Sequence, residues 1–124
     1  MGDVGIKRFE DIESWQEARL LVRDVYTFLN DCRDFGYKDQ MQRAAISIMS
    51  NIAEGFERGG NKEFRHFLTV ARGSLAEVKS LGYAGVDCGI LNREQFTIIE
   101  SRTDSINGLL NGFISYLTNN RSSF

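Results

Sequence analysis

Residues 43–60, RAAISIMSNIAEGFERGG, decide the fold because they form the pattern of one amphipathic helix followed by a glycine turn. At about 100° per residue, Ala45, Ile48 and Ile52 fall on one side of this helix. The other side carries five polar residues: Arg43, Ser47, Ser50, Asn51 and Glu54. Such a stripe is typical of a solvated face or of hydrogen bonding to a neighbouring helix. A nucleic-acid contact and a reaction centre are the alternatives that the stretch raises.

The rest of the chain repeats this pattern. Proline is absent, and glycines at Gly36, at the pair Gly59 and Gly60, and within 85–89 divide the sequence into four segments. Apolar residues recur in each at steps of three and four, without the alternation of a strand. The predicted helices cover residues of about 11–32, 38–57, 61–84 and 92–119. Because the connections are short, we predict an all-α fold, an antiparallel up-down-up-down four-helix bundle in a single domain, residues 1–124.

Polar residues at the predicted helix starts are candidate caps. Asp11 or Ser14 can cap the first helix, and Asn61 can cap the third. Asn92 and Gln95 have the spacing of a capping box at the start of the fourth. One glycine of the pair at 59–60 supplies the left-handed residue that ends the second helix.

Composition limits the cellular setting and the partners. The 15 Lys and Arg residues against 17 Asp and Glu residues give a net charge of −2, which argues against a general attraction to nucleic-acid backbones. No apolar run reaches the roughly 20 residues of a membrane span, and the N-terminus has no signal-peptide core. We expect a cytoplasmic protein without a membrane partner. Its two cysteines, Cys32 and Cys88, are expected at one end of the bundle and reduced.

Catalytic signatures are missing from the sequence. The chain has one histidine, His66, at no spacing from a serine that indicates an activated nucleophile. Neither a metal-ligand motif nor a nucleotide-binding loop is present. We therefore predict a protein that is not an enzyme and that carries no metal and no cofactor.

The loop after the second helix is a candidate anion site. Gly59 and Gly60 precede a helix N-terminus, which can present backbone N–H groups to a phosphate. Basic residues flank the pair at Arg58, Lys62 and Arg65. We treat these three as a possible contact for RNA, although the glycines are explained equally well by the turn.

Two helices carry more apolar residues than one core stripe requires. The first helix has Leu21 and Phe28 beside its stripe, and the fourth has Ile98, Leu109 and Tyr116. These residues either widen the core or form an oligomer contact, since exposed apolar patches mark interfaces. The residues alone leave both possibilities open.

Three stretches carry a family resemblance: FEDIESWQEARLLVRDVY at 9–26, RAAISIMSNIAEG at 43–55 and KEFRHFLTVARGSLAEVKSL at 62–81. They closely resemble the bacterial four-helix-bundle proteins encoded by intervening sequences of 23S rRNA genes. The motif residues on the polar side are Arg43, Ser47, Ser50, Asn51, Glu54, Arg72, Ser74 and Glu77. The resemblance implies an antiparallel bundle that assembles into a homopentamer and has no established enzymatic activity.

A related branch resembles the accessory proteins of diversity-generating retroelements, which engage a reverse transcriptase and nucleic acid. The leading hypothesis is therefore a non-enzymatic homo-oligomer whose partner is itself. The alternative is an RNA-binding accessory protein acting with rRNA or a reverse transcriptase. Within one subunit, we expect Arg72 and Glu77 to be near Arg43 and Glu54 and able to pair with them.

Overall fold

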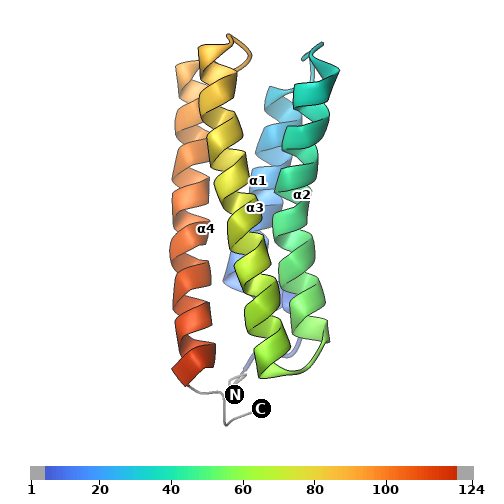
Figure 1. Ribbon diagram of the computed structural model, residues 1–124, viewed down its shortest axis with the longest axis vertical. Coiled ribbons are helices and arrows are strands. Elements are labelled where there is room, and N and C mark those ends of the chain that lie inside the picture. Colours follow the sequence, from blue (N-terminus) through green and yellow to red (C-terminus); the bar gives the residue numbers. More distant parts are fainter. Residues whose placement is uncertain (1–4, 120–124) are drawn as a thin grey trace.

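The computed structural model describes residues 5–119, which form four antiparallel helices after one short 3₁₀ helix (Figure 1). The elements are η1 (Phe9–Asp11), α1 (Glu13–Phe28), α2 (Phe35–Glu57), α3 (Asn61–Asp87) and α4 (Arg93–Asn119). The α1–α2 and α3–α4 connections lie at one end of the bundle, and the α2–α3 connection lies at the other (Figure 1). The predicted all-α four-helix bundle is confirmed, and no strand occurs within 5–119.

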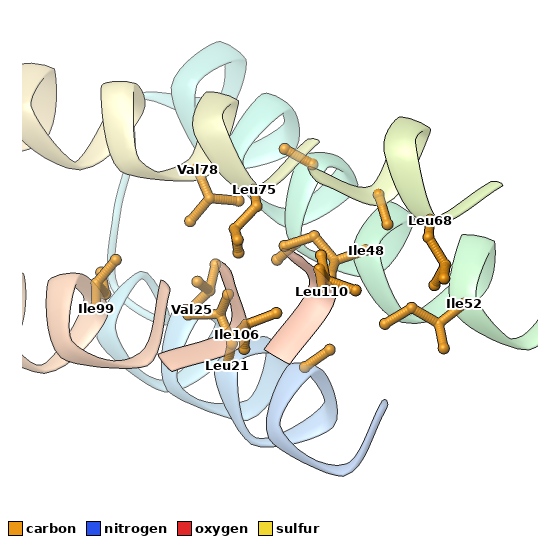
Figure 2. Packing of buried hydrophobic residues seen from close by; sticks show 14 of the residues in the cluster. Leu21, Val25, Ile48, Ile52, Leu68, Leu75, Val78, Ile99, Ile106 and Leu110 are labelled. Carbon is orange, nitrogen blue, oxygen red and sulfur yellow. The ribbon is translucent and has the colours of Figure 1, made fainter. Parts of the chain in front are cut away.

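All four helices contribute to one apolar core, which Figure 2 shows from close by. Leu21, Ile48, Leu68 and Ile106 are each 0 % exposed. Of the two possibilities left open for Leu21, the structure therefore shows the widened core, and an oligomer contact at this residue is excluded. Leu21 follows Ala18 by three residues and points into the core with it. In the described part of the chain, no helix is both long and apolar enough to cross a membrane.

The first helix starts and ends differently from the prediction, and the second starts earlier but ends at Glu57 as predicted. Residues Phe9–Asp11 form η1, so α1 begins only at Glu13, and neither Asp11 nor Ser14 caps it. It ends at Phe28, four residues before the predicted 32. The side chain of Asp34 accepts a hydrogen bond from the Tyr37 amide at 3.1 Å, which starts α2 at 35 rather than 38.

The third helix continues through Gly85, which was expected to end it after residue 84. A Cβ on Gly82 would lie 2.9 Å from the Phe96 ring, and one on Gly85 would meet Leu91 at 2.8 Å. These glycines therefore permit α4 and its preceding loop to approach α3. The helix ends at Asp87, two residues before Gly89, which has a φ of +75°.

Asn92 and Gln95 form the predicted capping box. The Gln95 amide donates to Asn92 Oδ1 at 2.7 Å, and the Asn92 amide donates to Gln95 Oε1 at 3.0 Å. Gly59, with a φ of +82°, supplies the left-handed residue after α2. Asn61, in contrast, is not a cap, because Gly60 occupies that position. Its Nδ2 donates instead to the carbonyl of Leu117 at 2.9 Å.

Tyr37 connects α2 with the far end of α3. Its hydroxyl donates to the carbonyl oxygen of Leu81 at 2.5 Å. Burial raises the pKa of Tyr37 from its ordinary 10.0 to about 12, and the charges of the nearby Cys32 and Cys88 thiols add to this rise. Both cysteines are free, as expected.

We expect Tyr37→Phe to lower the free energy of unfolding by about 0.5–1.5 kcal/mol near neutral pH, because the hydrogen bond is lost. The folded chain holds the phenol proton up to about pH 12, whereas the unfolded chain loses it near pH 10. The stability provided by the hydroxyl is therefore complete below pH 10 and declines as the pH rises from 10 toward about 12. Urea titrations of both proteins at about pH 8 and about pH 11 measure this. An equal difference at both pH values would contradict it.

Candidate functional site

The polar side of α2 meets α3 at a small hydrogen-bonded network. Ser47 Oγ lies 2.8 Å from Ser74 Oγ, so one hydroxyl donates to the other. Asn51 Nδ2 donates to the Ser47 carbonyl at 2.8 Å and to Ser47 Oγ at 3.0 Å. These part-buried polar groups satisfy one another's hydrogen-bonding requirements where α2 meets α3. For these three residues, the interhelical interpretation of the polar stripe is the one that the structure supports.

The expected pairing of Arg43 and Glu54 with α3 is wrong. Arg43 Nε pairs with Asp39 at 3.0 Å, and Glu54 pairs with Arg58 at 2.9 Å. Both are i,i+4 pairs on α2, where the helix itself brings the side chains together. Ser50 is exposed.

The charged motif residues of α3 also have other partners. Arg72 Nη1 donates to Asn111 Oδ1 on α4 at 2.8 Å. Glu77 accepts from Gln40 Nε2 on α2 at 3.2 Å. The eight motif residues thus do not converge on one point, and most of them connect neighbouring helices or turns.

His66 is exposed on α3 and packs its ring at the edge of Phe67, with centroids 5.8 Å apart. The hydroxyls of Ser47 and Ser74 are hydrogen-bonded to each other. Over residues 5–119, no group of three or more His, Cys, Asp or Glu side chains could hold a metal ion.

One of the three basic residues of the predicted anion site has its charge paired. Arg58 pairs with Glu54 at 2.9 Å and with Glu63 at 3.9 Å, and its guanidinium lies over the Phe67 ring at 5.0 Å. Arg65 Nε donates to the neutral amide oxygen Asn61 Oδ1 at 3.2 Å, which leaves its charge unpaired within residues 5–119. Lys62 is exposed and has no ion-pair partner among the described residues. Two unpaired basic groups therefore remain where three were predicted.

The second apolar line of α4 lies at the surface. Ile98 is 38 % exposed, Tyr116 is 39 % exposed, and Leu109 is partly buried between them. The spacings of 11 and 7 residues are close to whole numbers of turns, so these side chains share one side of α4.

The side of α4 that carries these three residues borders α1. Arg102, which lies on the same side, pairs with Asp24 at 2.5 Å and with Glu17 at 3.6 Å on α1. Phe28 is partly buried one turn after Asp24. We call this surface the α1–α4 face, defined by Phe28, Ile98, Leu109, Gly112 and Tyr116. The structure brings four of the five predicted contact residues to it.

A cleft of about 640 Å³ opens in the α1–α4 face, between the start of α1 and the C-terminal half of α4. Gly108 and Gly112 line it, and a Cβ on either would meet nothing within 4 Å. Asp11 and Glu13 lie at its other wall. The cleft therefore exists because two glycines leave space opposite the first turn of α1.

Ser14 lies in the wall of this cleft and is 2 % exposed. Among residues 5–119 its Oγ has no hydrogen-bond partner, which is uncommon for a buried hydroxyl. On the opposite wall, α4 carries no charged residue from Ser105 to Asn119. These four turns of α4 can be buried against another chain without desolvating a charged side chain.

Sequence reasoning missed Ser14, Gly108 and Gly112 as parts of a site. A signal was available, since the two glycines are spaced by four within the uncharged run 105–119. Such a pair gives a helix a shallow side along which another chain can approach closely. Arg102 was also missed, because its partners are on α1, 78 residues away for Asp24.

Comparisons with known proteins agree with the fold and with the resemblance found in the sequence. A family model described as 23S rRNA-intervening sequence protein matches residues 10–112. Among solved structures, the chain is similar to a protein of unknown function from the S23 ribosomal protein family of Bacteroides thetaiotaomicron VPI-5482. The TM-score is 0.76 at 24 % identity, over 82 % of this chain and 97 % of that one. That likeness concerns the fold alone. Among curated proteins, none matches.

Proposed function

Because the chain belongs to the 23S rRNA-intervening sequence protein family, we propose that it is a non-enzymatic assembly protein of the bacterial cytoplasm. Its subunits associate with one another through the α1–α4 face. The observation that carries this proposal is the line of Ile98, Leu109 and Tyr116, which stays at the surface beside a complete core. Exposed apolar side chains that share one side of a helix mark an interaction surface, and here only the paired Arg102 and Ser105 lie between Ile98 and Leu109 on that side.

The arrangement of these residues matters more than their number. Single exposed apolar side chains are normal on any protein. Here they follow one side of α4 from Ile98 to Tyr116, a distance of about 27 Å along the helix. A cleft lies at one end of this line, and the helix there has no charge to keep a neighbour away. The subunit number that we propose, five, comes from the family resemblance.

Light scattering on the purified chain, at two protein concentrations, tests the proposal. We expect a concentration-independent mass of about 70 kDa, five times the 14.1 kDa of one chain. Another fixed multiple would keep the assembly and correct the subunit number. A mass of 14.1 kDa at both concentrations would contradict the proposal.

An RNA-binding accessory role is the second candidate, and the exposed Lys62 beside the N-terminus of α3 favours it. A ring would repeat this single site in every subunit, and multivalency turns weak contacts into useful affinity.

If this role holds, Lys62→Glu combined with Arg65→Glu lowers the retention of structured RNA at low salt while the mass stays unchanged. Glu57→Gln, at the end of α2, is the control that alters a charge near the same loop. Retention that is equal in all three proteins would exclude this site.

A further inference from the structure

We infer that the cleft of the α1–α4 face receives the α1–α2 face of a second copy of this chain. The α1–α2 face is defined by Trp15, Arg19, Tyr26, Ile46 and Met49. This inference rests on the proposed assembly and names the two surfaces that meet in it.

The side chains of the α1–α2 face are placed by the contacts of their neighbours. On α1, Glu17 and Asp24 point toward Arg102 of α4, and the helical spacing puts Arg19 and Tyr26 on the other side. On α2, the residues that turn to α3 are Ser47 and Asn51. Ile46 and Met49 lie opposite these two, on the side of α2 nearer to α1.

The two faces match in polarity. Tyr26 is 43 % exposed and Ile46 is 38 % exposed, so the α1–α2 face presents apolar surface to solvent. The run Ala44–Ala53 on α2 carries no charge, like the run 105–119 on α4. Gly108 and Gly112 offer the space into which side chains of this apolar face can pack.

The few charges at the two surfaces are complementary. Arg19 lies over the Trp15 ring at 5.7 Å and has no ion-pair partner in the part of the chain that the structure describes. Asp11 and Glu13 in the cleft wall lack such partners as well, within the same residues. A guanidinium from the neighbouring copy would pair with them. Arg19 is six residues beyond Glu13, about 9 Å along α1, an offset that the two long side chains and a tilt of the bundles have to span in a closed ring.

The geometry of the two faces favours a closed ring. They are different surfaces, so the contact is heterologous and can repeat from copy to copy. They share α1 and are therefore adjacent sides of the bundle rather than opposite ones. When adjacent sides of the bundle meet, each added subunit is rotated relative to the one before, so the chain of subunits can close. When opposite sides meet, the subunits would line up in a filament.

The first test uses two glycine variants with the same new side chain. We expect Gly112→Arg to fill the cleft with a charged side chain and to reduce the scattering mass from that of the assembly to 14.1 kDa. Gly73→Arg is the control, because Gly73 is also a helical glycine with open space around its Cβ position. It should assemble like the wild type. Circular dichroism shows whether both variants remain helical.

The second test exchanges charges across the proposed contact. Glu13→Arg and Arg19→Glu should each weaken assembly, because like charges then meet, and the double variant should restore it. This rescue cannot arise from misfolding. If the wild type assembles but Gly112→Arg assembles equally and the double variant rescues nothing, this inference is overturned while the proposed function stands. A monomeric wild type overturns both.

Discussion

Gly55→Ala is expected to lower the free energy of unfolding by about 1–3 kcal/mol, although alanine is the better helix former. A Cβ at this position would lie 2.5 Å from Phe67 Cβ and 3.1 Å from the Phe64 ring. The Cβ of Phe67 is fixed to the backbone of α3 and cannot rotate away. Two helices that approach this closely must therefore separate, which weakens the packing on both sides of Gly55. Urea unfolding followed by circular dichroism measures the change.

Gly73→Ala is the matched control for this variant. Both glycines lie inside long helices, but a Cβ on Gly73 would meet nothing within 4 Å. The substitution should raise the free energy of unfolding by up to about 1 kcal/mol, because alanine loses less backbone freedom on folding. Opposite signs for the two variants are the expected result. Stabilisation by both would show that α2 and α3 are not in close contact at Gly55.

Asn61→Asp should lower the free energy of unfolding by about 1–3 kcal/mol. Asn61 is 5 % exposed, and its Nδ2 donates to the Leu117 carbonyl at 2.9 Å. A carboxylate cannot donate this hydrogen bond, and it would place negative charge against a carbonyl oxygen. The variant thus breaks the connection between the start of α3 and the end of α4. Thermal or urea unfolding measures the loss.

Asn92→Asp provides the comparison, because Asn92 does act as a cap. Its Oδ1 accepts from the Gln95 amide at 2.7 Å, and an aspartate oxygen accepts equally well. We expect a change of only a few tenths of a kcal/mol, since the two residues rank alike at helix N-caps. If Asn61→Asp were equally harmless, the bond to Leu117 would contribute little and Asn61 would resemble a cap after all.

The bundle itself could be predicted because its signals are local. Apolar spacing places Ile48, Leu68 and Ile106 in the core without knowledge of any partner helix. The capping box at Asn92 is also complete within four residues. The end of α3 could not be placed in this way. In the sequence Gly85 looks like a helix breaker, whereas in the folded chain it makes room for Leu91, as Gly82 does for Phe96.

The candidate site depends on contacts between distant residues, and these the sequence did not reveal. Nothing near Asn61 in the sequence indicates that its amide donates to Leu117, 56 residues away. Leu21 and Phe28 looked equivalent, yet Leu21 is 0 % exposed and Phe28 is partly exposed. The difference arises from a rotation of about 20° around α1, which is small in a helical pattern but decides which side chain reaches the core. The second apolar line of α4, in contrast, could be recognised in the sequence from its helical spacing.

The contact between α1 and α4 joins the parts of the bundle that lie farthest apart in the chain. Asp24 and Arg102 are separated by 78 residues, whereas the other principal helix contacts join consecutive helices. Closing so long a loop costs more entropy than forming a helical hairpin, so we expect this contact to form late in folding and to open first. A second copy that binds only the closed bundle would hold it closed by mass action. The last step in folding of one subunit would then depend on the concentration of the others.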